Sequence, residues 1–117
     1  MVSGRYVPDT GHIIKVDLNP SSGHEQAGWR PAVVLSPLAY NGKSGLAIVV
    51  PVTNQVKGYP FEVRLPAGMK TTGVVLADAL RSLDWHTRRA RYVEVAPAEV
   101  LRAIYERVTA LLGIAGR

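Results

Sequence analysis

A charged loop that leads directly into an apolar run is the first place where this chain could hold reactive side chains. In the stretch GHEQAGWRPAVVLSP, residues 23–37, Glu25 and Arg30 flank a glycine turn that continues as a β-branched segment. Catalytic side chains commonly lie on loops that a rigid element anchors, so this stretch is a candidate site. The alternative is a surface ion pair worth about 0–1 kcal/mol, which is the commoner explanation for an isolated pair.

A second polar cluster begins abruptly where another apolar run ends. Thr53, Asn54, Gln55 and Lys57 follow the segment LAIVVPV, residues 46–52. Hydroxyl, amide and ammonium groups are costly to bury unless each finds a partner. If both strands end at the same rim of the fold, this cluster would lie close to the first one. A simple polar turn is the alternative.

A third candidate is the segment DALRSLDW, residues 78–85. Arg81 offers a guanidinium that can pair with a phosphate, and Trp85 offers a flat face for stacking. A tryptophan such as Trp85 is more often a core or interface aromatic, whose indole N–H would then need one acceptor. A surface salt bridge is the alternative for Arg81.

Several common chemistries have no matching residues in this chain. His12, His24 and His86 lack metal-ligand spacing, so we expect them to be solvated or structurally bonded. The chain has no cysteine, which excludes disulfides, thiolate nucleophiles and zinc–thiolate sites. It also lacks a glycine-rich phosphate loop, an HExxH helix and a GxSxG elbow. The commonest cofactor chemistries are therefore excluded.

Length and composition limit the kind of protein further. The 117 residues predict a single domain over 1–117, and a hydrophobic content of 47% predicts a packed core. The net charge of +5 favours an anionic partner such as nucleic acid. The amino terminus lacks a signal-peptide apolar region, and the longest apolar run, 46–52, is too short to cross a bilayer. We therefore expect a cytoplasmic protein.

Strand patterns occupy the first four-fifths of the chain, and a helical pattern closes it. Short apolar or alternating segments predict strands at 13–18, 31–36, 46–52, 61–65, 74–77 and 91–95. Short strands at such spacing predict a small barrel or a strongly curved sheet. Val100, Ile104, Val108 and Leu111 then recur at helical spacing after Pro97, which suits a first helical turn. We expect this amphipathic helix to pack its apolar stripe against the sheet.

Taken in order, several motifs make the chain resemble the MazF/PemK family of toxin endoribonucleases from about Tyr6 to Leu112. The motifs are Gly11, Val16-Asp17, EQAGWRPAVVLSP at 25–37, Pro51 with Thr53, GYPFEV at 58–63, GVVLAD at 73–78 and RSLDW at 81–85. The resemblance implies a mainly-β (α+β) fold, namely a small SH3-like barrel of about six or seven strands with a C-terminal covering helix. It also implies a homodimer.

The same resemblance implies a toxin of a type II toxin–antitoxin system. Such a toxin would cleave single-stranded RNA, including mRNA, at specific short sequences, without a metal ion or other cofactor. A cognate antitoxin would neutralise it by laying its C-terminal tail across the RNA groove. Because RNA carries its own nucleophile, attack by the 2′-hydroxyl should leave a 2′,3′-cyclic phosphate and a 5′-hydroxyl.

The family's functional residues map onto the first two clusters. Its catalytic arginine falls on Arg30, its catalytic threonine on Thr53, and an acidic residue of the same loop on Glu25. We expect Arg30 to stabilise charge in the transition state and Thr53 to position the scissile phosphate. Glu25 could orient Arg30 or accept the proton, so the identities of the general base and acid stay open. The side chains expected to bind RNA are Trp29, Asn54, Gln55, Lys57 and Arg81.

Three positions depart from the family's pattern. His12 stands where an acidic residue is frequent, and Lys15 where an aromatic residue is frequent. Ala79 stands where glutamine often follows the aspartate. These departures leave the expected chemistry intact and concern base preference.

Two other functions are consistent with such a fold. One is a CcdB-like toxin that poisons DNA gyrase without catalysis, but such toxins rely on a C-terminal Trp-Gly-Ile, and here Leu112 precedes Gly113-Ile114. The other is a catalytically inactive module that binds an antitoxin. The presence of both Arg30 and Thr53 disfavours it.

Overall fold

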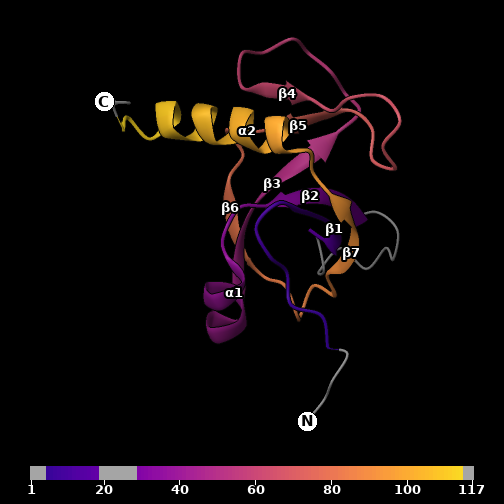
Figure 1. The fold of residues 1–117 in the computed structure, drawn as a ribbon, viewed down its shortest axis with the longest axis vertical. Coiled ribbons are helices and arrows are strands. Elements are labelled where there is room, and N and C mark those ends of the chain that lie inside the picture. The colour runs from indigo at the N-terminus through magenta and orange to yellow at the C-terminus, as the bar shows by residue number, and fades with distance from the viewer. Residues whose placement is uncertain (1–4, 19–28, 115–117) are drawn as a thin grey trace.

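The computed structural model of the chain describes residues 5–18 and 29–114 (Figure 1). Within these ranges the backbone forms seven strands and two helices. They are β1 (His12–Asp17), β2 (Trp29–Val34), α1 (Leu38–Ser44), β3 (Leu46–Thr53), β4 (Glu62–Arg64), β5 (Val74–Leu76), β6 (Arg81–Asp84), β7 (Arg91–Val95) and α2 (Ala98–Leu111). All six strands predicted from the sequence are present, together with the C-terminal helix. The elements β6 and α1 were not predicted.

The strands form one antiparallel sheet with the order β4-β5-β3-β2-β1-β7. The mainly-β architecture with a C-terminal helix is therefore confirmed. Among the described strands the sheet is not closed as a full barrel would be, since β4 and β7 end the path and do not pair with each other.

The sheet forks at β3. On the edge away from β2, residues 46–49 of β3 pair with β6, whereas Val52 and Thr53 pair with β5. The change of partner occurs around Pro51, which has no N–H to donate to a ladder. One long strand therefore serves two branches of the sheet, and its C-terminal end carries Thr53 out of the core.

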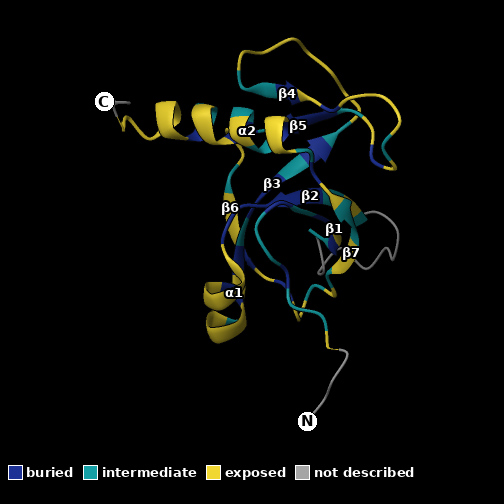
Figure 2. Ribbon diagram, in the orientation of Figure 1, coloured by how far each residue is buried: buried dark blue, intermediate teal, exposed yellow. Residues whose placement is uncertain are grey.

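Two buried clusters lie on the two faces of the central strands. Figure 2 shows that most of the residues of these strands are buried. Neighbouring residues of β1 point to opposite faces, so Ile13 belongs to one cluster and Ile14 to the other. Both side chains are fully buried. Apolar residues on both faces explain why these strands read as continuous apolar runs rather than as an alternating pattern.

The helix α2 covers one of these clusters through Val100, Ile104 and Val108, as the sequence predicted. Leu111, expected as the fourth member of the stripe, is 43% exposed, so that part of the prediction is wrong. The last turn of α2 extends beyond the sheet, where no strand can cover it (Figure 1). Pro97 lies at the N-cap rather than in the first turn. Neither described helix is long and apolar enough to cross a membrane.

The short helix α1 depends on contacts from outside its own segment. The backbone N–H of Leu38 donates to Oδ1 of Asp9 at 2.9 Å, which caps a helix start that has no side-chain cap of its own. Asn41 is completely buried and donates from Nδ2 to the carbonyl of Pro8 at 2.8 Å. Gly45 ends the helix with φ 77°, the left-handed conformation that favours glycine.

Candidate active site

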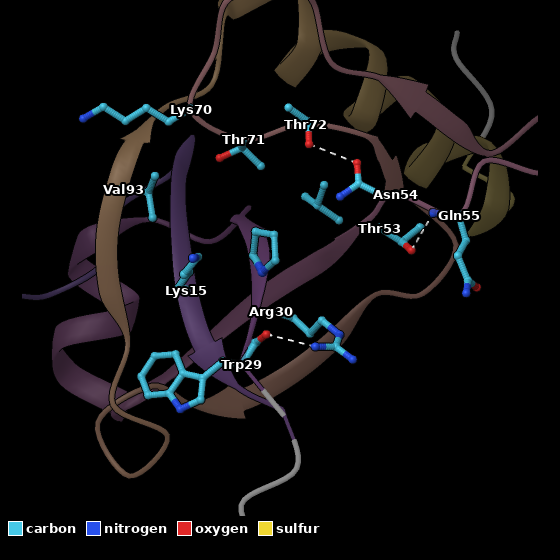
Figure 3. Close-up of a pocket in the computed structure, with 12 residues that line it drawn as sticks. Lys15, Trp29, Arg30, Thr53, Asn54, Gln55, Lys70, Thr71, Thr72 and Val93 are labelled. Atoms are coloured by element: carbon cyan, nitrogen blue, oxygen red, sulfur yellow. Dashed lines mark hydrogen bonds between the residues drawn. The ribbon is translucent and has the colours of Figure 1, made fainter. Parts of the chain in front are cut away.

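One cleft of about 730 Å³ lies where the ends of several strands meet (Figure 3). It gathers residues from β1, β2, β3 and β7 and from the turn before β5. Its lining residues are Lys15, Trp29, Arg30, Pro31, Val52, Thr53, Asn54, Gln55, Lys70, Thr71, Thr72 and Val93. Arg30 of the first polar cluster and Thr53, Asn54 and Gln55 of the second therefore share one depression.

The register between β2 and β3 brings Arg30 and Thr53 into this cleft. The paired ladder ends at Ala32 and Pro51, and the same register extended by two residues sets Arg30 level with Thr53. Level residues on neighbouring strands point to the same face of a sheet. The structure thus places the two side chains together, and Figure 3 shows both in the cleft.

The Arg30 side chain is exposed at the cleft and is steadied by its own backbone neighbour. Its Nη1 donates to the carbonyl of Trp29 at 3.1 Å. This bond uses one of the several N–H groups of the guanidinium, whose planar fork can bind two oxygens of one phosphate. The group is therefore arranged to bind an anion in the cleft.

Thr53 occupies a tight turn at the end of β3. Its Oγ1 accepts a hydrogen bond from the backbone N–H of Gln55 at 3.1 Å, which fixes the hydroxyl oxygen and leaves the hydroxyl proton to donate elsewhere. Asn54 is fixed in a similar way, because its Oδ1 accepts a hydrogen bond from Oγ1 of Thr72 at 3.0 Å. Both side chains are held before any ligand arrives.

The backbone of Gly73 lies directly against the turn that carries Thr53. Gly73 has φ 110°, and a Cβ at this position would lie 2.2 Å from the carbonyl oxygen of Thr53. Only glycine satisfies both the conformation and the space. The start of β5 can therefore approach the end of β3 closely enough to shape the cleft.

The turn Lys70–Thr72 forms the opposite wall of the cleft and was not predicted from the sequence. A carboxylate from β7 holds it, since Oε2 of Glu94 accepts the N–H of Thr71 at 2.7 Å and Oε1 accepts the N–H of Lys70 at 3.2 Å. Burial is the largest single effect and would raise the pKa of Glu94. The hydrogen bond from the Thr71 side chain, these two backbone hydrogen bonds and the charge of Lys70 together outweigh burial and lower the pKa of the carboxyl below its ordinary value. We call Asn54, Gln55, Thr71 and Thr72 the polar end of the cleft.

The other end of the cleft is aromatic and positively charged. Trp29 and Lys15 line it, and the guanidinium carbon of Arg91 lies 5.3 Å from the centroid of the Trp29 ring, a cation–π contact. Arg91 contacts Trp29 but is not itself among the residues that line the cleft. We call Lys15, Trp29 and Arg91 the cationic end. In Figure 3 the Arg30 side chain lies between Trp29 and Thr53. Trp29 was expected to bind RNA, whereas Lys15 was noted only as a departure from the family pattern.

Three other residues predicted for the site lie outside the cleft lining or outside the described residues. Lys57 is exposed in the loop after β3, where its backbone N–H donates to Oε2 of Glu62 at 3.0 Å. Arg81 is exposed on β6 opposite Val49, several residues from the end of β3. Neither belongs to the lining. Glu25 falls outside the described residues.

Trp85 is a core residue and not a stacking surface. It is 7% exposed, and its indole Nε1–H donates to the carbonyl of Asn41 at 3.0 Å. This is the acceptor that a core tryptophan requires.

His12 also has a structural environment. Its Nδ1 lies 2.7 Å from the hydroxyl of Tyr6, and the two rings stack. Burial is the largest of the effects that raise the pKa of Tyr6, so this hydroxyl stays protonated. Within residues 5–18 and 29–114, no group of three or more histidine, aspartate or glutamate residues is arranged to hold a metal ion.

Comparison with known proteins places this cleft in context. Residues 9–112 match the model of the PemK-like, MazF-like toxins of type II toxin–antitoxin systems. The chain is 50% identical over 113 residues to the endoribonuclease toxin MazF of Escherichia coli K12, covering 97% of this chain and 100% of that protein. It is 36% identical to the endoribonuclease PemK of Escherichia coli, covering 89% and 81%. A crystal structure of MazE–MazF from Deinococcus radiodurans gives a TM-score of 0.86 at 50% identity, covering 95% and 100%.

Proposed function

The chain belongs to the PemK-like, MazF-like family of type II toxin–antitoxin toxins, and we propose that it is an endoribonuclease that cuts single-stranded RNA in the Arg30–Thr53 cleft. The relatives at 50% and 36% identity are themselves named endoribonucleases. The observation that carries the proposal is geometric: β2 and β3 deliver a guanidinium and a hydroxyl to the same cleft.

The proposed reaction needs little from the protein beyond alignment and charge stabilisation. The 2′-hydroxyl of the cut nucleotide attacks the adjacent phosphorus, forming the new P–O2′ bond as the P–O5′ bond breaks. The products are a 2′,3′-cyclic phosphate and a 5′-hydroxyl, and the proton lost by the 2′-oxygen is balanced by the one gained by the leaving oxygen. The nucleophile is already next to the phosphorus, so proximity and stabilisation of the phosphoryl charge supply the catalysis.

Arg30 takes the role of stabilising this charge, because its planar fork matches two phosphoryl oxygens. Thr53 donates its hydroxyl proton to the same phosphate, since its oxygen is already fixed by the N–H of Gln55. Glu25 is the candidate to orient Arg30 or to accept the 2′-proton. The reaction written in this way requires no metal ion and no cofactor.

The polar end of the cleft supplies candidates for base recognition. Asn54 and Gln55 present amides that can pair with the edges of unstacked bases. Lys57 and Arg81 lie outside the lining, so they serve as contacts to RNA that extends beyond the cleft. Trp29 offers a ring for stacking at the cationic end.

The regulatory partner is an antitoxin. The crystal structure from Deinococcus radiodurans pairs a MazF with MazE, and we expect a cognate antitoxin of this chain to cover the cleft with its C-terminal tail. We also expect the toxin to act in the cytoplasm as a homodimer. An apolar groove of about 520 Å³ supports self-association, and its lining residues are Leu35, Ser36, Pro37, Tyr40, Ile48, Leu80, Tyr105 and Val108.

Incubation of the purified protein with a long mixed-sequence RNA, with and without a chelator, tests the proposal. We expect fragments in both samples, and end analysis should show cyclic phosphates and 5′-hydroxyls. Intact RNA together with inhibited DNA gyrase would instead assign the protein to the CcdB-like mode of action. Mapping the fragment ends would also give the recognised bases.

A further inference from the structure

We propose that Lys15, Trp29 and Arg91 form a second nucleotide-binding subsite, which stacks one unpaired base on Trp29 and holds the phosphate beside that base with Lys15. This inference rests on the proposed function, because it assumes that RNA occupies the cleft. It goes beyond that function by assigning a binding role to Lys15 and Arg91.

The three residues come from three neighbouring strands and face the same side of the sheet. In the antiparallel register, Lys15 of β1 pairs with Pro31 of β2 on one side and with Arg91 of β7 on the other. Lys15 and Trp29 both line the cleft that holds Arg30. The subsite is therefore continuous with the proposed reaction site.

A hydrogen bond also joins the subsite to the catalytic side chain. Trp29 precedes Arg30 in β2, and its carbonyl accepts the hydrogen bond from Nη1 of Arg30. Successive residues of a strand point to opposite faces, but Trp29 and Arg30 both line the cleft at the start of β2, so RNA whose phosphate contacts Arg30 can reach the indole with an adjacent nucleotide. Stacking platforms interleaved with cations are how proteins hold single strands without base pairing.

Trp29 is positioned to serve as such a platform. It is half-buried, and the guanidinium of Arg91 over its ring limits the orientations of the indole. Trp85, the second of the chain's two tryptophans, is instead buried in the core with its N–H satisfied. The two tryptophans therefore have different environments, and of the two only Trp29 can contact a ligand in the cleft.

Lys15 is an exposed cation in an otherwise buried strand. Its neighbours Ile13, Ile14 and Val16 are all 0% exposed. With Arg30 and Arg91 it concentrates positive charge at this end, which an anion would offset. The carboxylate of Glu94 on β7 is engaged by the N–H groups of Lys70 and Thr71. Asp17 pairs with Trp29, so it lies on the same face of the sheet and offsets part of the positive charge of Lys15, Arg30 and Arg91.

Intrinsic fluorescence tests the stacking directly. The probe is an RNA oligonucleotide that spans a mapped cut site and carries a single 2′-deoxy substitution at the cut nucleotide. This RNA should bind without being cut. We expect it to quench the tryptophan emission of the wild-type protein, and we expect the quenching to disappear in Trp29→Phe, where only the buried Trp85 emits. Unchanged quenching in Trp29→Phe would overturn the stacking assignment.

Binding of the same probe, measured by fluorescence anisotropy, tests the phosphate contact. We expect Trp29→Ala to weaken binding roughly tenfold or more and Lys15→Gln to weaken it several-fold. Lys15→Gln should also reduce the slope of log affinity against log salt by about 0.7, the value for one phosphate contact on a single strand. Arg102→Gln is the matched control, because Arg102 is an exposed cation on α2 outside the cleft, and it should change neither quantity.

Shortened probes locate the subsite along the RNA. As nucleotides are removed one at a time from either end, one truncation should abolish the difference between wild type and Lys15→Gln. Equal effects of Lys15→Gln on every probe, or no effect on any, would overturn the proposal. If Lys15→Gln weakens the binding of poly-glutamate but leaves RNA binding unchanged, the proposal is also overturned, and the surface is assigned to an acidic peptide.

Cleavage of the unsubstituted RNA separates this inference from the proposed function. If the wild type cuts this RNA and the Lys15 and Trp29 variants bind the probe normally, only the subsite is refuted. If the wild type cuts no RNA, the proposed endoribonuclease function is refuted, whatever the binding measurements show.

Discussion

The polar end and the cationic end of the cleft flank the same pair, Arg30 and Thr53, but different forces hold them in place. At the polar end, a hydrogen bond of 3.0 Å from Thr72 fixes the side chain of Asn54, and Glu94 fixes the backbone of the turn Lys70–Thr72. At the cationic end, side chains come from three strands, and one cation–π contact at 5.3 Å restrains Arg91 and Trp29.

This difference predicts separate roles for the two ends of the cleft. Groups that are fixed before the ligand arrives can impose geometry on a reacting phosphate, so changes near the polar end should appear in the cleavage rate. Flexible charges attract and retain a polyanion, so changes at the cationic end should appear in affinity and in salt dependence. The following predictions test this comparison.

Removal of the central guanidinium should have the largest effect. Arg30→Ala is expected to raise the barrier by about 3 kcal/mol or more, which lowers the single-turnover rate at least about a hundredfold. Arg30→Lys keeps a charge but loses the planar fork, and it should fall between Arg30→Ala and the wild type. A rate for Arg30→Ala equal to that of the wild type would remove Arg30 from the reaction.

The close approach at Gly73 should be the next most sensitive feature. In Gly73→Ala the new Cβ would meet the carbonyl of Thr53 and the residue would keep a left-handed φ, so we expect a loss of about 2–3 kcal/mol in the free energy of unfolding. Gly68→Ala is the matched control. Gly68 has φ 94° but nothing within 4 Å, so it should lose only about 1 kcal/mol. Urea titrations of both variants check this, and equal losses would refute a special role for Gly73.

The hydroxyl of Thr53 should contribute less than the guanidinium. Thr53→Val preserves the shape but removes both the acceptor for the N–H of Gln55 and the donor to the phosphate. We expect the cleavage rate to fall about tenfold, as for the loss of one hydrogen bond to a charged group. Thr53→Ser should retain most of the rate. If the serine variant is as slow as the valine variant, the hydroxyl is not the contributing group.

The carboxylate that holds the turn Lys70–Thr72 should produce the smallest effect, visible as a pH dependence. The pKa of Glu94 is lowered from its ordinary value of 4.5, so its contribution to stability is present above that pH and is lost as the pH falls through the folded-state pKa. Wild type should therefore be more stable than Glu94→Gln at pH 7, and this difference should shrink below pH 4.5. Urea titrations at several pH values measure it, and a constant difference would contradict the assignment.

The regular parts of the fold could be predicted from the sequence because their signals are local. The apolar runs of β2 and β3 and the helical spacing of Val100, Ile104 and Val108 all depend on nearby residues. The helix α1 could not be predicted from local signals, since its cap comes from Asp9, far away in the chain. The strand β6 contains a single buried side chain, Leu83, and exists because it pairs with β3.

The candidate site shows the same limit. Arg30 and Thr53 stood out because each follows or begins an apolar strand, and antiparallel pairing then makes them meet. The turn Lys70–Thr72 carried no such signal, because a carboxylate on β7 sets its position. Lys15 did have a sequence signal, because it is a cation within an apolar segment, but only the fold shows that it lines the cleft.

One measurement tests the central claim most directly, namely that this cleft cuts RNA by using the substrate's own 2′-hydroxyl. The wild-type protein is given two RNA oligonucleotides that differ only in a single 2′-deoxy substitution at the cut nucleotide, and binding and single-turnover cleavage are followed for both. We predict equal binding of both strands, with cleavage of the unsubstituted strand alone. Cleavage of the substituted strand at the same bond would contradict the account.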